Sequence, residues 1–163
     1  MFYTTLQTNL GPWYICQQGQ AIVRLSIGET PPFAAEKQDT DLLKQARRQI
    51  TEYLAGMRTS FNLPLEPAGT PFQKAVWEAL LRIPYGETVC YGDLAQMVGR
   101  PKGARAVGGA CHQNPIPLII PCHRVVGKDG SLTGFGLGLD MKIALLNLEQ
   151  GKMDLFQFLA STS

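Results

Sequence analysis

One segment constrains the fold of this chain more than any other: residues 115–126, with the sequence PIPLIIPCHRVV. Most of its residues are apolar, so we expect burial, and its three prolines fix φ and favour an extended course over a helix. At its centre a thiol, an imidazole and a guanidinium are consecutive, at Cys122, His123 and Arg124. A buried polar group without a partner costs about 1–3 kcal/mol, and a buried charge costs more. The segment therefore needs partners for all three groups, or uses them for chemistry.

The position of Cys122 favours a reactive thiol. A cysteine is a good nucleophile only as its thiolate, and a neighbouring imidazole or cation lowers the thiol pKa. Consecutive residues of an extended chain point to opposite faces, so Cys122 and His123 cooperate only if the backbone turns or a water relays the proton. A lone cysteine is usually a small, inert core residue. Three adjacent polar groups inside an apolar run make that interpretation the weaker one here.

The composition is that of an ordinary globular protein with one large or two small domains. The chain has 163 residues, of which 45% are hydrophobic and 17% are charged. No apolar run approaches the roughly 20 residues of a membrane span, and no signal peptide is evident. The four cysteines, at positions 16, 90, 111 and 122, have neither CxxC nor zinc-finger spacing. We expect reduced thiols, no metal site, no membrane partner and a cytoplasmic location.

The net charge of +2 says nothing about nucleic acid, but its distribution is informative. Between Asp93 and Asp129 there is no acidic residue. The same stretch holds five basic residues: Arg100, Lys102, Arg105, Arg124 and Lys128. A locally basic segment is typical of contact with phosphates, although a plain solvated surface also explains it.

The first half of the chain predicts strands followed by a helix. Residues 1–28 alternate between polar and apolar and predict a three-stranded antiparallel meander. A polar loop over residues 29–39 precedes a helix that is capped by Thr40 or Asp41 and runs to about residue 55. A Pro-rich linker follows, so we divide the chain into domains of residues 1–69 and 70–163. The first domain contains no cluster of potentially catalytic residues, and we expect it to pack against the second domain and position it.

The second half predicts a helix-turn-helix. Thr70 and Pro71 start a helix whose apolar stripe comprises Phe72, Val76, Leu80 and Ile83, thickened by Ala75, Trp77, Ala79 and Leu81. A short helix over residues 92–98, a turn and a helix over residues 102–112 follow. Most residues of the helix over residues 102–112 are small. This favours close approach of its backbone to a DNA groove over the reading of bases by long side chains. A final helix is expected from an Asp140 cap to about residue 149.

Several separated segments resemble the O6-alkylguanine-DNA alkyltransferases, also called methylated-DNA–protein-cysteine methyltransferases. The matching segments are Pro121–Val125, Gly103–Ala110 and Asn114–Pro115, within roughly residues 70–151. The resemblance implies an α+β fold: a small ribonuclease H-like α/β domain, then a mainly helical domain like a winged helix-turn-helix. It also implies DNA repair by base flipping, with irreversible alkyl transfer from O6-alkylguanine in double-stranded DNA to Cys122, without a cofactor. Activity on O4-alkylthymine stays open.

The resemblance assigns catalytic roles to four residues. Cys122 is the nucleophile, and His123 takes its proton, directly or through a water. Glu149 orients His123, although the sequence alone favours a solvated Glu149 that opposes the helix dipole at its end of the last helix. Tyr91 donates a hydrogen bond or proton to the leaving guanine.

The resemblance also implies a DNA-contacting surface and a substrate pocket. Arg105 fills the gap left by a flipped nucleotide, and Cys111 packs in the core or faces the groove. The full set of expected DNA contacts is Tyr91, Lys102, Arg105, Ala106, Gly108, Gly109 and Cys111. Pocket residues are expected to be Asn114, Val125, Phe135 and Gly136. Asn114 bridges the helix to the active-site turn, caps the helix, or does both.

Two other functions stay open. A helix-turn-helix lesion sensor or regulator would bind DNA without chemistry, but sensors that resemble this family lack the cysteine that Cys122 provides. A hydrolytic cysteine enzyme would need an oxyanion hole and repeated turnover, and it would leave the helix of small residues unexplained. We expect a monomer that acts with the nucleoid of a prokaryote or in the nucleus of a eukaryote.

Overall fold

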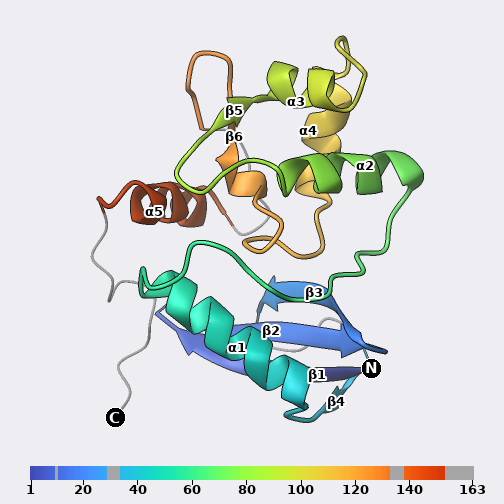
Figure 1. The fold of residues 1–163 in the computed structure, drawn as a ribbon, viewed down its shortest axis with the longest axis vertical. Coiled ribbons are helices and arrows are strands. Elements are labelled where there is room, and N and C mark those ends of the chain that lie inside the picture. The colour runs from blue at the N-terminus through green and yellow to red at the C-terminus, as the bar shows by residue number, and fades with distance from the viewer. Residues whose placement is uncertain (10, 29–33, 133–137, 153–163) are drawn as a thin grey trace. The chain divides into compact units, whose positions relative to one another are not determined.

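The computed structural model of the protein describes residues 1–9, 11–28, 34–132 and 138–152. Residues 1–67 form one compact unit and residues 68–150 form another (Figure 1). The domain boundary that we placed after residue 69 stays a prediction. Across the described ranges, the helices are too short or too polar to cross a membrane.

The first unit is built on a four-stranded sheet with the strand order β3-β2-β1-β4. Its elements are β1 (Phe2–Thr8), β2 (Gly11–Gln18), β3 (Ala21–Ile27), β4 (Glu36–Lys37) and α1 (Asp41–Leu54). The antiparallel meander β1-β2-β3 is confirmed. The loop expected over residues 29–39 misses β4, which pairs parallel to β1. This strand has only two residues, both exposed and polar, so it carries no hydrophobic alternation.

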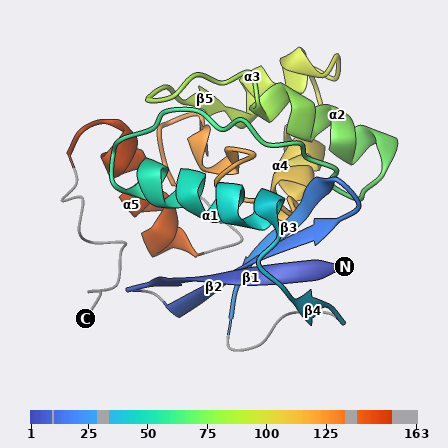
Figure 2. The same cartoon turned by 60° about the horizontal axis from the view of Figure 1, so that its bottom comes forward.

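Helix α1 lies along one face of this sheet (Figures 1 and 2). Its cap is Thr40, whose Oγ1 accepts a hydrogen bond from the Leu43 amide at 3.1 Å. The helix buries residues at helical spacing: Leu43, Ala46, Gln49, Ile50, Tyr53 and Leu54. The apolar members of this set supply most of its packing free energy, at about 25 cal/mol per Å² of buried apolar surface.

The second unit is mainly helical. Its elements are α2 (Pro71–Leu80), β5 (Val89–Cys90), α3 (Tyr91–Met97), α4 (Ala104–His112), the 3-10 helix η1 (Cys122–Arg124), β6 (Val125–Val126) and α5 (Leu139–Glu149). Strands β5 and β6 pair in parallel. The expected α+β class, with a sheet domain before a helical one, is confirmed. Two details are wrong: Ala75 and Leu81 are exposed, and α5 starts one residue before Asp140, after Gly138 at φ 98°.

Helices α2, α3 and α4 pack together around fully buried Val76, Leu80, Leu94 and Val107. Thr70 and Gln73 close α2 with a reciprocal capping box. The Trp77 indole nitrogen donates to the Ala110 carbonyl at 2.9 Å in the interior. This buried bond fixes α2 against the last turn of α4, which leads directly into residues 115–126.

Residues 115–126 are buried as expected, but the expected extended course is wrong for most of the segment. Leu118 has φ 76°, and the Ile120 amide donates to the Ile116 carbonyl at 2.9 Å. A 3-10 turn follows at Cys122–Arg124, so only Val125 and Val126 form a strand. Proline fixes its own φ but leaves the next residue free to turn, and burying apolar side chains on all sides favours this compact path.

Candidate active site and nucleic-acid interface

The turn η1 presents Cys122 and His123 from consecutive positions. A 3-10 helix has three residues per turn, so neighbouring side chains are not on opposite faces as they are in a strand. The backbone turn that cooperation between these residues requires is therefore present. The Cys122 residue is 5% exposed and His123 is fully buried. A reagent therefore reaches this thiol only through a small opening or after local movement.

Asn114 connects the end of α4 to the cysteine. Its Nδ2 donates to the Cys122 sulfur at 3.2 Å and to the Ile120 carbonyl at 2.8 Å. Its Oδ1 accepts from the Ile116 amide at 3.0 Å. The C-cap of α4 is Gln113, so of the two alternatives for Asn114 the structure has the bridge. The side chain fixes the turn and places a hydrogen-bond donor on the sulfur.

The Cys122 thiol carries its proton at neutral pH in this structure. Burial raises the pKa of Cys122 to about 11, although the Asn114 hydrogen bond and the Lys142 charge act in the opposite direction. The sequence reasoning emphasised activation and underrated this desolvation. A reaction at the sulfur therefore needs a base that removes the proton as the substrate arrives.

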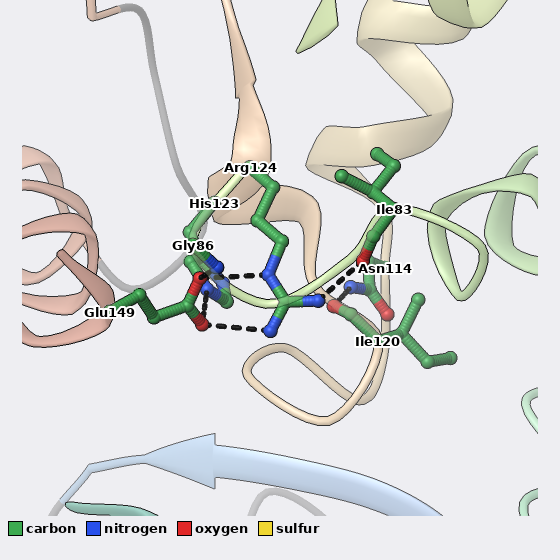
Figure 3. Close-up of polar contacts among 7 residues, drawn as sticks. All are labelled: Ile83, Gly86, Asn114, Ile120, His123, Arg124 and Glu149. Carbon is green, nitrogen blue, oxygen red and sulfur yellow. Dashed lines mark hydrogen bonds and ion pairs between the residues drawn. The ribbon is translucent and has the colours of Figure 1, made fainter. Parts of the chain in front are cut away.

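His123 and Arg124 share one carboxylate, that of Glu149 at the end of α5 (Figure 3). His123 Nε2 lies 2.8 Å from Glu149 Oε2. Arg124 donates from Nε to Oε1 at 2.8 Å and from Nη2 to Oε2 at 2.9 Å. Its Nη1 donates to the Ile83 carbonyl at 2.6 Å, and the Gly86 amide lies 3.4 Å from Oε1. Glu149 is thus buried and paired, not solvated.

The environment keeps His123 neutral. Burial lowers the pKa of His123 most; the hydrogen bond and charge of Glu149 oppose this, and the charges of Arg124 and Lys142 lower it further. A neutral imidazole accepts a proton, whereas an imidazolium does not. The pair of His123 and Glu149 therefore has the protonation state that a general base needs.

Sequence reasoning missed the role of Arg124 as a partner of Glu149, and it missed Lys142. Lys142 is 1% exposed, and its Nζ donates to the Val125 carbonyl at 2.6 Å. A signal was present: Lys142 precedes Leu145 and Glu149 at spacings of three and seven, on the buried stripe of α5. A lysine on an apolar stripe needs an acceptor. Val125, expected in the substrate pocket, supplies that acceptor with its main chain.

Helix α4 separates the expected DNA contacts into two faces. Lys102 just before the helix and Arg105, Ala106 and Gly109 within it are exposed. Gly108 packs beside Tyr91, where an added Cβ would lie 3.6 Å from the ring. Cys111 lies on the buried side at 8% exposure, and burial raises its pKa to about 12. The structure thus places Cys111 in the interior, away from the exposed set. Phe135 and Gly136 lie outside the described residues.

Comparison with known proteins identifies the family. Residues 71–151 match the family described as "6-O-methylguanine DNA methyltransferase, DNA binding domain", and residues 1–67 match its "ribonuclease-like domain". The chain belongs to the 6-O-methylguanine DNA methyltransferase family. This confirms the resemblance that the segments around Cys122 carry.

Relatives in this methyltransferase family match along nearly the whole chain. The constitutive methylated-DNA–protein-cysteine methyltransferase of Bacillus subtilis is 44% identical over 91% of this chain and 95% of its own length. The Methanosarcina acetivorans protein of that name is 44% identical over 91% of this chain and 98% of its own. The crystal structure of Mycobacterium tuberculosis OGT in complex with DNA has 42% identity and a TM-score of 0.86, covering 93% of this chain and 94% of that one.

Proposed function

We propose that this protein repairs DNA by moving the alkyl group of O6-alkylguanine in a duplex onto the sulfur of Cys122. The observation that carries the proposal is a buried thiol followed directly in the chain by a neutral, carboxylate-bound imidazole, in a turn that Asn114 ties to a helix with a small, basic exposed face. Family membership and the names of the relatives agree with it. A stacked base cannot reach such a thiol, so the target nucleotide is flipped out at a cost of a few kcal/mol.

The chemistry is a displacement at the alkyl carbon. The Cys122 proton passes to His123, directly or through a water, and Glu149 stabilises the resulting imidazolium. The sulfur attacks the carbon, the S–C bond forms and the C–O6 bond breaks. Guanine leaves with a hydrogen bond from Tyr91, and the proton taken from the thiol ends on the purine. The balance is thiol plus O6-alkylguanine giving thioether plus guanine.

The product is stable, so each molecule reacts once. A thioether is not labile as a thioester is, and no second nucleophile is assigned to regenerate the thiol. The transferred group stays on Cys122, and no metal or organic cofactor enters the balance.

The proposed DNA surface is the exposed side of α4. Lys102 contacts phosphate, Arg105 fills the gap left by the flipped base, and the small Ala106 and Gly109 allow close approach to a narrow groove. Asn114 and the main chain of Val125 border the pocket, with Phe135 and Gly136 assigned to it by resemblance. The protein acts as a monomer in the compartment that holds the chromosome.

The test is mass spectrometry of the protein after mixing with a duplex that contains one O6-methylguanine. We expect a gain of one methylene, located on the Cys122 peptide and saturating near one equivalent. Cys122→Ser should show no gain, while Cys111→Ser, which removes another buried thiol, should still react. Binding without a mass gain would indicate a lesion sensor, and repeated release of product would indicate a hydrolase; either result rejects the proposal.

A further inference from the structure

All three nitrogens of the Arg124 guanidinium donate hydrogen bonds inside the second unit. Its Nε and Nη2 grip the two oxygens of Glu149 in a fork, and its Nη1 donates to the Ile83 carbonyl (Figure 3). The side chains of Arg124 and Glu149 are 9% and 1% exposed. A buried ion pair carries a desolvation penalty that often exceeds its attraction, so it is weak evidence for stability. We therefore look for the role of this ion pair in its effect on the neighbouring imidazole of His123.

Both oxygens of Glu149 accept from Arg124, and one of them also faces His123. Oε1 receives Arg124 Nε and lies 3.4 Å from the Gly86 amide, while Oε2 receives Arg124 Nη2 and His123 Nε2. A carboxylate held in this way has its charge offset by a permanent cation. Without that cation, the buried carboxylate would keep its full negative charge beside His123. A buried carboxylate then favours a proton on its imidazole partner.

The charged and titratable groups around His123 come from two elements and one loop. Glu149 and Lys142 face it from α5, and Arg124 and Cys122 belong to its own turn. Tyr85, in the loop after α2, stands beside Arg124, whose Cζ lies 5.7 Å from the ring centroid. Of these groups, Glu149 favours the imidazolium, whereas Arg124 and Lys142 disfavour it. Arg124 is the one that also fixes where the carboxylate lies.

We propose that Arg124 is a positioning residue: by gripping both oxygens of Glu149 it holds the carboxylate against His123 while keeping the imidazole neutral and ready to accept the Cys122 proton. The inference rests on the proposed function only for the meaning of that proton transfer. Its electrostatic part concerns His123 alone and is measured without DNA. The two parts are therefore separable by experiment.

The first experiment measures the protonation of His123 by NMR of its ring nitrogens as the pH is changed. The chain has two histidines, and exposed His112 serves as the internal reference signal. Removing Arg124 removes an effect that lowers the pKa of His123, so Arg124→Met should move the His123 titration to higher pH. Arg124→Lys keeps a cation but loses the fork, and it should shift in the same direction by less. Arg48→Met, a change at an exposed arginine of α1, should leave His123 unchanged.

The second measurement is the single-turnover rate of methyl transfer against pH. A protonated His123 cannot act as a base. In Arg124→Met the acid limb of the pH–rate profile should therefore move to higher pH, together with the NMR titration of His123. Each unit of movement gives about a tenfold loss of rate below the limb, and the rate recovers above it. Glu149→Gln keeps an acceptor for His123 but removes the carboxylate charge that Arg124 offsets, so adding Arg124→Met to that variant should move the titration of His123 less than it does in the wild-type protein.

A purely structural Arg124 would lower the active fraction equally at all pH values and leave the His123 titration in place. That result, in Arg124→Met or in Arg124→Lys if the former does not fold, overturns the inference. A shift that persists unchanged in the Glu149→Gln background also overturns it, because the effect would not pass through the carboxylate. If His123 shifts as expected but the wild-type protein transfers no methyl group, the proposed function fails while the electrostatic role of Arg124 stands.

Discussion

The two units each contain an arginine that binds a glutamate with Nε and Nη2, in very different surroundings. In the first unit Arg58 reaches a single oxygen of Glu52 at 3.1 and 3.0 Å, with side chains 25% and 36% exposed. In the second, Arg124 engages both oxygens of Glu149 at 2.8 and 2.9 Å in a dry interior. A surface pair contributes about 0–1 kcal/mol, whereas removing one partner of a buried pair costs about 3–5 kcal/mol. The ion pair with the larger desolvation cost, Arg124–Glu149, is thus the one whose carboxylate also binds an imidazole.

The largest effect should follow from Glu149→Ala. It leaves Arg124 buried without its counter-ion and His123 without its acceptor, so the free energy of unfolding should fall by about 3–5 kcal/mol. The transfer rate should fall by about 100-fold or more, because the base loses its orientation. Glu52→Ala is the matched control and should lose less than about 1 kcal/mol. Urea unfolding measures the loss of stability, and single-turnover kinetics measures the loss of rate. Equal losses of stability in the two variants would show that the buried and the exposed ion pair do not differ as argued.

Asn114→Ala should have the next largest effect. It leaves the buried Ile116 amide and Ile120 carbonyl without the Asn114 side chain, at about 1–3 kcal/mol for each group that finds no other partner. It also removes a hydrogen bond that lowers the pKa of Cys122, so the pKa should rise above about 11 and alkylation at neutral pH should slow. Gln113→Ala, at an exposed neighbouring position, is the control. Unchanged thiol reactivity in Asn114→Ala would show that the sulfur bond has no influence.

Lys142→Met should separate stability from reactivity. An apolar side chain of similar length replaces a buried cation but leaves the Val125 carbonyl without this donor, so the free energy of unfolding should fall by no more than about 1–3 kcal/mol. The Lys142 charge lowers the pKa of Cys122, so its loss should raise that pKa and slow reaction with iodoacetamide at neutral pH. Lys74→Met, on the exposed side of α2, should alter neither quantity. Faster alkylation in Lys142→Met would contradict the assigned sign.

Residues 115–126 illustrate what the sequence could predict and what it could not. Their burial followed from composition, and the pairing of His123 with Glu149 followed from the family resemblance. Their path did not, because Leu118 turns at φ 76° under packing forces that no local pattern encodes. The partners of buried cations were missed for the same reason: the acceptors of Lys142 and of Arg124 Nη1 are main-chain carbonyls, and a carbonyl is present at every position.

The smallest effect, and the one that tests the comparison most directly, is the salt response of Arg58→Met. Arg58 also donates from Nη1 to the Ser60 carbonyl at 3.1 Å, so its loss removes a surface contact as well as a charge pair. We expect a loss below about 1 kcal/mol at low salt, and this loss should shrink as added salt weakens the attraction between the exposed charges. Glu149→Ala should keep its full loss across the same salt series, because water and ions do not reach the pair. Thermal unfolding at several salt concentrations measures both. A salt-sensitive loss at Glu149 would mean that solvent reaches Arg124, and the dry environment that keeps His123 neutral would then have no basis.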